Sequence, residues 1–302
     1  MMMSVEQRDR ARGALLGLAV GDALGTTLEF RARDTYQPLT DMVGGGPFKL
    51  APGVWTDDTA MALALADSLA GRDMLDPHDL MERFLGWWRE GEYSPTGECF
   101  DIGVTTSEAL ARYAKNGDPF AGSTDPMTAG NGSLMRLAPV SLWGLGRNRD
   151  AMLQAARDQS RTTHGAGTCL DACAAFSIIL AETIEGAPLA DSLAAAGRLN
   201  LASPVAGIIA GSWRDKARDA IRSSGYVAHS LEAALWCVDN SADFASCALL
   251  AANLGEDADT TAAIAGQLAG SLYGMSAIPP QWLEQLAWRD RLVQAADTLI
   301  GS

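Results

Sequence analysis

Two short clusters of carboxylates and hydroxyls stand out because each comes directly before a long alanine-rich run. Thr56-Asp57-Asp58-Thr59 precedes AMALALADSLAG, and Asp257-Ala258-Asp259-Thr260-Thr261 precedes AAIAGQLAGSLYG. Such residues can simply cap a helix, since their oxygens accept hydrogen bonds from its free backbone amides. A cap needs only one acceptor, however, and each cluster holds two carboxylates, whose mutual repulsion a cation would relieve. For either cluster alone, capping and metal binding both remain open.

The two clusters together offer only oxygen ligands. The candidate metal ligands are Thr56, Asp57, Asp58, Asp257, Asp259 and Thr260. All-oxygen sites without His or Cys select Mg²⁺ or Mn²⁺. If the fold joins the clusters, they could hold two ions about 4 Å apart, as in binuclear hydrolases.

The elements that must position these clusters are helices. Hydrophobic residues make up 48% of the chain but aromatic residues only 7%, so Ala and Leu dominate, which favours packed helices over sheets. No long, low-complexity linker interrupts the helical pattern. We therefore predict a single all-α domain over residues 1–302. Besides the two helices that follow the clusters, helices are expected near residues 5–24, 77–90, 101–115, 133–145, 148–161, 168–185, 188–199, 214–223, 229–238 and 241–253, and irregular chain over 26–55, 92–100, 117–132 and 200–212.

Two of the expected helices carry glycine at four-residue spacing. Gly13, Gly17, Gly21 and Gly25 lie in the first helix, and Gly266, Gly270 and Gly274 follow the second cluster. Glycine inside a helix costs about 1 kcal/mol relative to alanine. Close packing between these two helices would offset that cost.

Charge and targeting signals narrow the function classes. The formal net charge of −14 disfavours a nucleic-acid or anionic-membrane surface. The polar start of the chain does not resemble a signal peptide, and the apolar stretch 168–181 contains Asp171, which indicates a buried helix rather than a membrane span. The five cysteines are odd in number and irregularly spaced, as expected for small buried side chains in a reducing cytoplasm.

Six segments together resemble the ADP-ribosylglycohydrolase family. They are GALLGLAVGDALGTTLEF (13–30), WTDDTAMALALADSL (55–69), FDIG (100–103), GNGSLMRLAPV (130–140), SRTTH (160–164) and NLGEDADTTAAIAGQLAGSLYG (253–274). The resemblance implies a single all-α domain with two Mg²⁺ or Mn²⁺ ions in a central cleft. It also implies that the six candidate ligands bind the ions, which grip the hydroxyls of the distal ribose and polarise a water near its anomeric carbon.

The resemblance assigns further site residues. Asp101, in FDIG, and Glu29, in TLEF, match acidic residues implicated in catalysis in different branches of the family. Asp101 could instead cap the following helix, and Glu29 could be a surface carboxylate. The segment with Gly130, Asn131, Gly132, Ser133 and Met135 matches the family's phosphate-binding stretch, whose glycines and helix start can hold a diphosphate without basic residues. His164 matches a cleft residue near the adenosine end of the ligand, although a core or capping histidine is equally compatible with its position.

The implied activity is hydrolysis of the bond between ADP-ribose and a modified protein side chain, most readily arginine, with ADP-ribose as the product. One departure concerns Val104, which stands where the dinitrogenase reductase-activating branch has Asn beside the scissile bond. The alternatives are hydrolysis of another conjugate (serine-linked, at a nucleic-acid end, or a small ester) and a non-catalytic, ADP-ribose-binding or structural relative. A phosphohydrolase would ordinarily need Lys or Arg on the phosphate, and none lies near the clusters in sequence.

Overall fold

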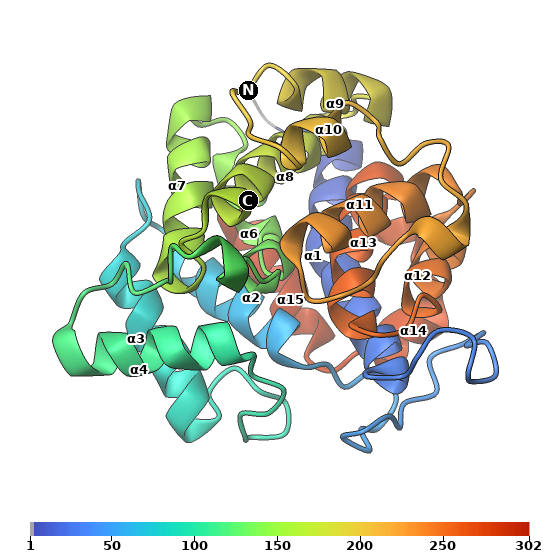
Figure 1. Ribbon diagram of the computed structural model, residues 1–302, viewed down its shortest axis with the longest axis horizontal. Coiled ribbons are helices and arrows are strands. Elements are labelled where there is room, and N and C mark those ends of the chain that lie inside the picture. The colour runs from blue at the N-terminus through green and yellow to red at the C-terminus, as the bar shows by residue number, and fades with distance from the viewer. Residues whose placement is uncertain (1–2, 302) are drawn as a thin grey trace.

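Two glycine-bearing helices, α1 (Val5–Gly25) and α13 (Ala258–Tyr273), lie antiparallel at the centre of the molecule (Figure 1). A β-carbon at Gly17 would overlap with the carbonyl group of Gly266, and one at Gly21 would overlap with that of Ala262. The two backbones therefore approach closely enough that no side chain fits between them. The expected packing of the two glycine stripes is confirmed.

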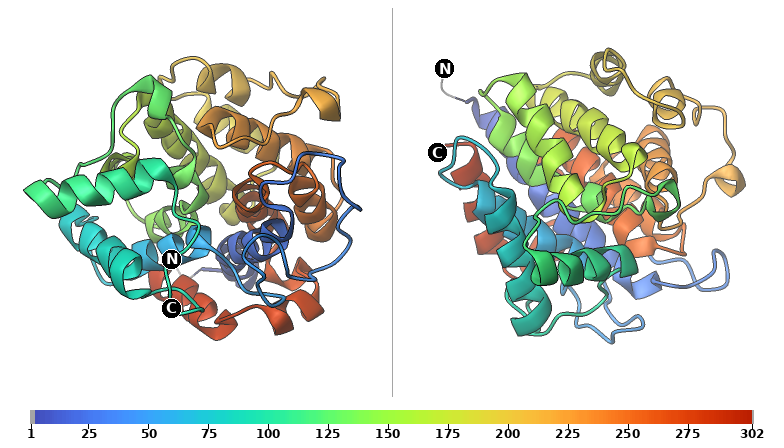
Figure 2. Two further views of the ribbon diagram at one scale, coloured as in Figure 1. Left: turned by 60° about the horizontal axis from the view of Figure 1, so that its bottom comes forward. Right: turned by 60° about the vertical axis from the view of Figure 1, so that its left-hand side comes forward.

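The computed structural model describes residues 3–301, and this part of the chain is a single helical domain without a β-strand. The remaining α-helices are α2 (Asp57–Leu69), α3 (Pro77–Glu90), α4 (Val104–Asn116), α5 (Gly132–Met135), α6 (Ala138–Gly144), α7 (Arg149–Thr163), α8 (Gly167–Glu185), α9 (Leu189–Ala196), α10 (Val205–Ile209), α11 (Val227–Asp239), α12 (Phe244–Ala252), α14 (Pro280–Gln285) and α15 (Arg289–Leu299). Short 3₁₀ turns lie at Thr26–Leu28, Pro126–Thr128, Arg218–Ala220 and Met275–Ala277. Figure 2 shows α3 and α4 together at one edge, and α9 and α10 at another.

The apolar stretch at 168–181 belongs to α8, which is a core helix. By length and composition α8 could cross a membrane, but 72% of its apolar window is buried inside the protein. It packs against α7 and α9, and also against α1 and α13. The expectation of a buried helix is thus confirmed.

One expected helix, 133–145, is divided into α5 and α6, and its proline explains the break. Pro139 has no backbone N–H, so it cannot donate to the carbonyl of Met135 four residues earlier. That carbonyl instead accepts a hydrogen bond of 2.6 Å from the Gln267 amide on α13. The break therefore ties α5 to the central helix.

Two further expectations were wrong, and tertiary contacts explain the first of them. Residues 214–223 form turns rather than a helix, because their carbonyls hold neighbouring segments: Arg218 O accepts from the Arg33 guanidinium at 2.8 Å, and Ser223 O accepts from Asp257 N at 2.9 Å. The region 200–212, expected to be irregular, contains the short helix α10. The sequence analysis also missed α14 and α15.

Candidate metal centre and cleft

The starts of α2 and α13 lie next to each other, as the binuclear hypothesis requires. The Thr56 hydroxyl is 3.3 Å from Asp58 Oδ2 and 3.5 Å from Asp259 Oδ2. The two clusters are about 200 residues apart in sequence, and the close contact between α1 and α13 helps to bring them together. The expected adjacency of the two helix starts is confirmed.

The N-cap residue of neither cluster caps its own helix through its side chain. The side chains at the N-cap positions, Thr56 and Asp257, make no capping hydrogen bond. At α2 the cap comes from Asp22 on α1, whose carboxylate accepts from the backbone amides and hydroxyls of Thr56 and Thr59 over 2.6–3.0 Å. The capping explanation of the first cluster is therefore wrong.

At α13 the cap comes from Glu29, just after α1. Glu29 Oε2 accepts from Ala258 N at 2.7 Å and from Asp259 N at 3.3 Å. Glu29 is only 4% exposed, so it is not a surface carboxylate. Asp257 is therefore not needed as the cap of α13: its Oδ2 accepts from the Asn131 amide at 2.8 Å, while Asp259 Oδ1 accepts from Thr260 N at 2.7 Å.

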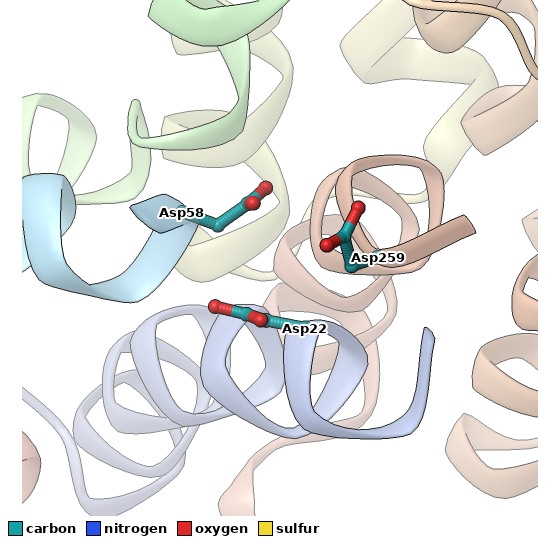
Figure 3. Close-up of side chains that lie close together, drawn as sticks. All are labelled: Asp22, Asp58 and Asp259. Atoms are coloured by element: carbon teal, nitrogen blue, oxygen red, sulfur yellow. The ribbon is translucent and has the colours of Figure 1, made fainter. Parts of the chain in front are cut away.

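The carboxylates form two groups that share Asp259. Oxygen atoms of Asp22, Asp58 and Asp259 lie within 4.8 Å of one another, and so do oxygen atoms of Glu29, Asp257 and Asp259. Figure 3 shows the first group, with three side chains from α1, α2 and α13 directed toward a common point. Asp22 and Glu29 were not among the predicted ligands. Asp22 carried a signal, because it is a charged residue inside the apolar, glycine-rich run LAVGDALG.

Burial and mutual repulsion raise the pKa values of these carboxyl groups. The pKa rises to about 7 for Asp22, Asp257 and Asp259, through burial and then repulsion within the cluster. The pKa values of Asp57 and Asp58 lie well above the usual range for the same reasons. Asp58 Oδ1 is also buried without a hydrogen-bond partner. Crowded carboxylates with an unpartnered oxygen fit divalent cations. A bound cation would displace the protons that these groups otherwise hold and would contact the unpartnered oxygen.

A cleft of about 560 Å³ opens from this cluster. Of the predicted site residues, those that line it are Glu29, Asp57, Asp101, Gly130, Asn131, Gly132, Met135, His164, Asp257, Asp259 and Thr260. Thr56, Asp58 and Ser133 do not line it, and the Ser133 hydroxyl accepts from that of Ser160 at 2.8 Å. Val104 also lines the cleft and is 72% exposed.

Asp101 faces the cluster rather than capping α4. The N-cap residue of α4 is Gly103, and Asp101 adopts a left-handed backbone with φ of 59°. Its carboxyl interacts with that of Asp259, and burial raises its pKa to about 6. The capping alternative for Asp101 is wrong.

The glycine-rich turn before α5 has fewer free backbone N–H groups for a ligand than its sequence indicates. Gly130 N donates to Thr128 O and Asn131 N donates to Gly225 O, whereas Gly132 N and Ser133 N have no acceptor within residues 3–301. The Asn131 amide bridges the turn to the carboxylate cluster, with 2.8 Å to Asp257 Oδ2. Only two backbone donors thus remain for a ligand.

Comparisons with known proteins agree with this geometry. The sequence profile of the ADP-ribosylglycohydrolase family matches residues 3–302. The chain belongs to the ADP-ribosylglycohydrolase family. It is 48% identical over 291 residues to the ADP-ribosylarginine hydrolase Tri1 of Pseudomonas putida, covering 96% of this chain and 78% of the relative.

Two other members of the family extend the comparison. The chain is 36% identical to the ADP-ribosyl-[dinitrogen reductase] glycohydrolase of Rhodospirillum rubrum, over 92% of this chain and 90% of that enzyme. A solved structure described as an ADP-ribosylglycohydrolase-related protein complex is 42% identical, has a TM-score of 0.87 and covers 98% of both chains. The family, its helical fold and its enzymatic class are therefore established for this protein.

Proposed function

We propose that this protein hydrolyses the bond between ADP-ribose and an arginine side chain of a modified protein, with two Mg²⁺ or Mn²⁺ ions as cofactors. The carboxylate cluster around Asp259, open to the cleft, carries the proposal. Two relatives named for ADP-ribosylarginine and for ADP-ribosylated dinitrogen reductase support the substrate class. We place the reaction in the cytoplasm and expect ADP-ribose as the product.

We assign metal binding to the oxygens around Asp259. Thr56, Asp57, Asp58, Asp257, Asp259 and Thr260 would hold the ions, as the family resemblance implies, and the two carboxylate groups that share Asp259 support this assignment. Bound divalent ions would polarise the ribose hydroxyls and a nearby water. Asp22 and Glu29 would position the ligand helices through their capping bonds.

The chain's own residues would position the sugar and move protons. Glycosidic cleavage at ribose develops positive charge at the anomeric carbon, which nearby carboxylates stabilise. Asp101 and Glu29 both line the cleft beside Asp259 and are the candidates for proton transfer. We propose that the diphosphate lies against the free amides of Gly132 and Ser133, with Asn131, Met135 and His164 alongside.

The charge of the cleft favours arginine as the linkage. Six acidic residues line it, Glu29, Asp57, Asp101, Glu256, Asp257 and Asp259, and no Lys or Arg of the described chain does. Even with two ions offsetting part of this charge, the field attracts a cationic guanidinium. Since the leaving guanidine is already charged, its departure needs little protonation, whereas a serine ether depends on a well-placed acid.

Peptides of equal sequence, ADP-ribosylated at arginine or at serine, test the linkage. We expect a higher kcat/KM for the arginine-linked peptide, with free ADP-ribose as the readout. Serine-linked hydrolysis faster by about tenfold or more, a gap of ~1.4 kcal/mol, would overturn the arginine assignment in favour of another conjugate. ADP-ribose binding without turnover of either peptide would indicate a non-catalytic relative.

A further inference from the structure

Arg136, between α5 and α6, is fully buried and has no carboxylate partner within the described residues. Its guanidinium donates to Gln159 Oε1 at 2.9 Å, to Gln159 O at 2.7 Å and to Gly132 O at 3.0 Å, and it lies over the Phe84 ring. Burying a cation without a counter-charge is costly, and these hydrogen bonds offset part of that cost.

One of these donors reaches the cleft through a hydroxyl. Arg136 Nη2 donates to Thr163 Oγ1 at 2.9 Å, and Thr163 Oγ1 lies 2.8 Å from His164 Nδ1. His164 follows the end of α7, is 3% exposed and lines the cleft. A buried cation is thereby connected to an imidazole in the ligand cleft.

The order of donors favours one tautomer of His164. A guanidinium can only donate, so Thr163 Oγ1 accepts from Arg136. The single hydroxyl proton of Thr163 is still available to donate, and within residues 3–301 its one hydrogen-bonding neighbour that can accept is His164 Nδ1. A neutral imidazole that accepts at Nδ1 carries its proton on Nε2. Burial, with the nearby Arg136 charge, lowers the pKa of His164 to about 3, in keeping with a neutral ring.

The Nε2 atom faces the glycine turn. A β-carbon at Gly132 would lie 3.1 Å from Nε2, and one at Gly130 would lie 3.2 Å from it. No group of the described chain forms a hydrogen bond with Nε2, and the atom is not sealed from the cleft. The absence of side chains at both glycines keeps this face of the ring open.

We propose that Arg136 and Thr163 are positioning residues that hold His164 in the tautomer with the proton on Nε2, so that the ring donates a hydrogen bond to an anionic phosphate oxygen in the cleft. The inference rests on the proposed function, because the phosphate belongs to ADP-ribose. It explains how an acidic protein adds a donor to the diphosphate without placing a positive charge there. Two neutral amides and one neutral imidazole then share the anion.

Two substitutions separate the relay from simple packing. Thr163→Val removes the hydroxyl between Arg136 and His164, and Thr163→Ser retains it. Thr162→Val is the matched control, since Thr162 is equally buried and lies 3.4 Å from the same Arg136 nitrogen, but its hydroxyl donates to Gln159 O and not to His164. Nitrogen-15 NMR of the imidazoles reports the tautomer, and calorimetry reports ADP-ribose affinity in the presence of Mg²⁺.

We expect His164 to be protonated on Nε2 in the unaltered protein and in the Ser variant. Thr163→Val should lose this single tautomer and bind ADP-ribose roughly tenfold to a hundredfold more weakly, as for loss of a hydrogen bond to a charged group. Thr162→Val should change neither property. A proton on Nδ1 in the unaltered protein, or undiminished affinity in Thr163→Val, would overturn the inference.

The two readouts also separate this inference from the proposed function. If the unaltered protein bound no ADP-ribose, the proposed function would fail together with the ligand role of His164. The tautomer measurement needs no ligand and would still test the relay itself. Should Thr163→Val not fold, the tautomer of the unaltered protein and the affinity of Thr163→Ser decide the matter.

Discussion

The first turns of α2 and α13 are both capped by a carboxylate, but the two carboxylates lie in different surroundings. Each helix receives its cap from a carboxylate on or just after α1, Asp22 for α2 and Glu29 for α13. Asp22 is fully buried, makes four hydrogen bonds to Thr56 and Thr59, and does not line the cleft. Glu29 lines the cleft, and only its Oε2 accepts from the helix.

This difference predicts a structural role for one capping carboxylate and a catalytic role for the other. A carboxylate whose two oxygens are both engaged by the protein can fix the position of a helix but has little left for a ligand. A carboxylate that caps with one oxygen can still present the other to the cleft. We therefore expect Asp22 to determine where the ligands lie, and Glu29 to act on the substrate.

The largest effect is expected at Asp259, which belongs to both carboxylate groups. Asp259→Asn should lower kcat/KM by roughly a thousandfold or more, corresponding to several kcal/mol of lost metal-assisted stabilisation. The metal-free variant should melt no lower than the metal-free parent, because one crowded carboxylate is gone. Calorimetric metal titration and thermal melting check both points, and Asp58→Asn is the companion variant. Retained metal occupancy and activity in both would show that the ligand assignment is wrong.

Glu29→Gln should separate catalysis from capping at α13. The remaining carbonyl oxygen can still accept from Ala258 N and Asp259 N, so the melting temperature should be retained. Loss of the ionisable group should lower kcat by roughly a hundredfold, within the range of general acid–base contributions. Steady-state kinetics and melting would be measured on the same preparation. A fall in stability with unchanged kcat would make Glu29 another purely structural cap.

Asp22→Asn should give the converse result at α2. An amide in place of the carboxylate turns an NH₂ group toward donors of Thr56 or Thr59, which costs about 1–3 kcal/mol for the unsatisfied groups. Metal affinity should fall by roughly 10–100-fold, as for loss of a group that orients metal ligands. Chemical denaturation and metal titration measure these effects. A fully stable variant with normal metal affinity would abolish the distinction between the two caps.

The smallest effect concerns pH. The folded-state pKa values of Asp22, Asp257 and Asp259, about 7, exceed the ordinary value of 3.8, so their contribution to stability is present at low pH and is lost as pH rises through 7. Addition of Mg²⁺ should consequently raise the melting temperature by a few degrees more at pH 8 than at pH 5.5. The difference should shrink in Asp259→Asn. An equal gain at both pH values would argue against linked proton release.

Most helices could be predicted because their signals are local. For α3, for example, the Asp76-Pro77 start and the Gly91 end directly flank the helix. The wrong prediction of a helix at 214–223 has a different origin. Its residues are compatible with a helix, but two of its backbone carbonyls accept hydrogen bonds from Arg33 and Asp257 instead. The division of 133–145 could have been anticipated from Pro139, although its partner Gln267 could not.

The all-helical class, the two oxygen-rich helix starts and the glycine stripes follow from the amino-acid sequence alone, because each of these is encoded by residues close together in the chain. Three further relations became visible only in the folded protein: Asp22 and Glu29 cap those helices, Asp259 joins two carboxylate groups, and Arg136 reaches His164 through Thr163. Those relations depend on pairs of residues from different helices, and a side chain's neighbours across a helix interface leave no periodic trace in sequence. The antiparallel packing of α1 against α13 brings the separate sequence clusters into one candidate metal centre. Because glycines at the contact carry no side chains, the two helices approach closely enough for the carboxylates of Asp22 and Asp259 to lie near each other.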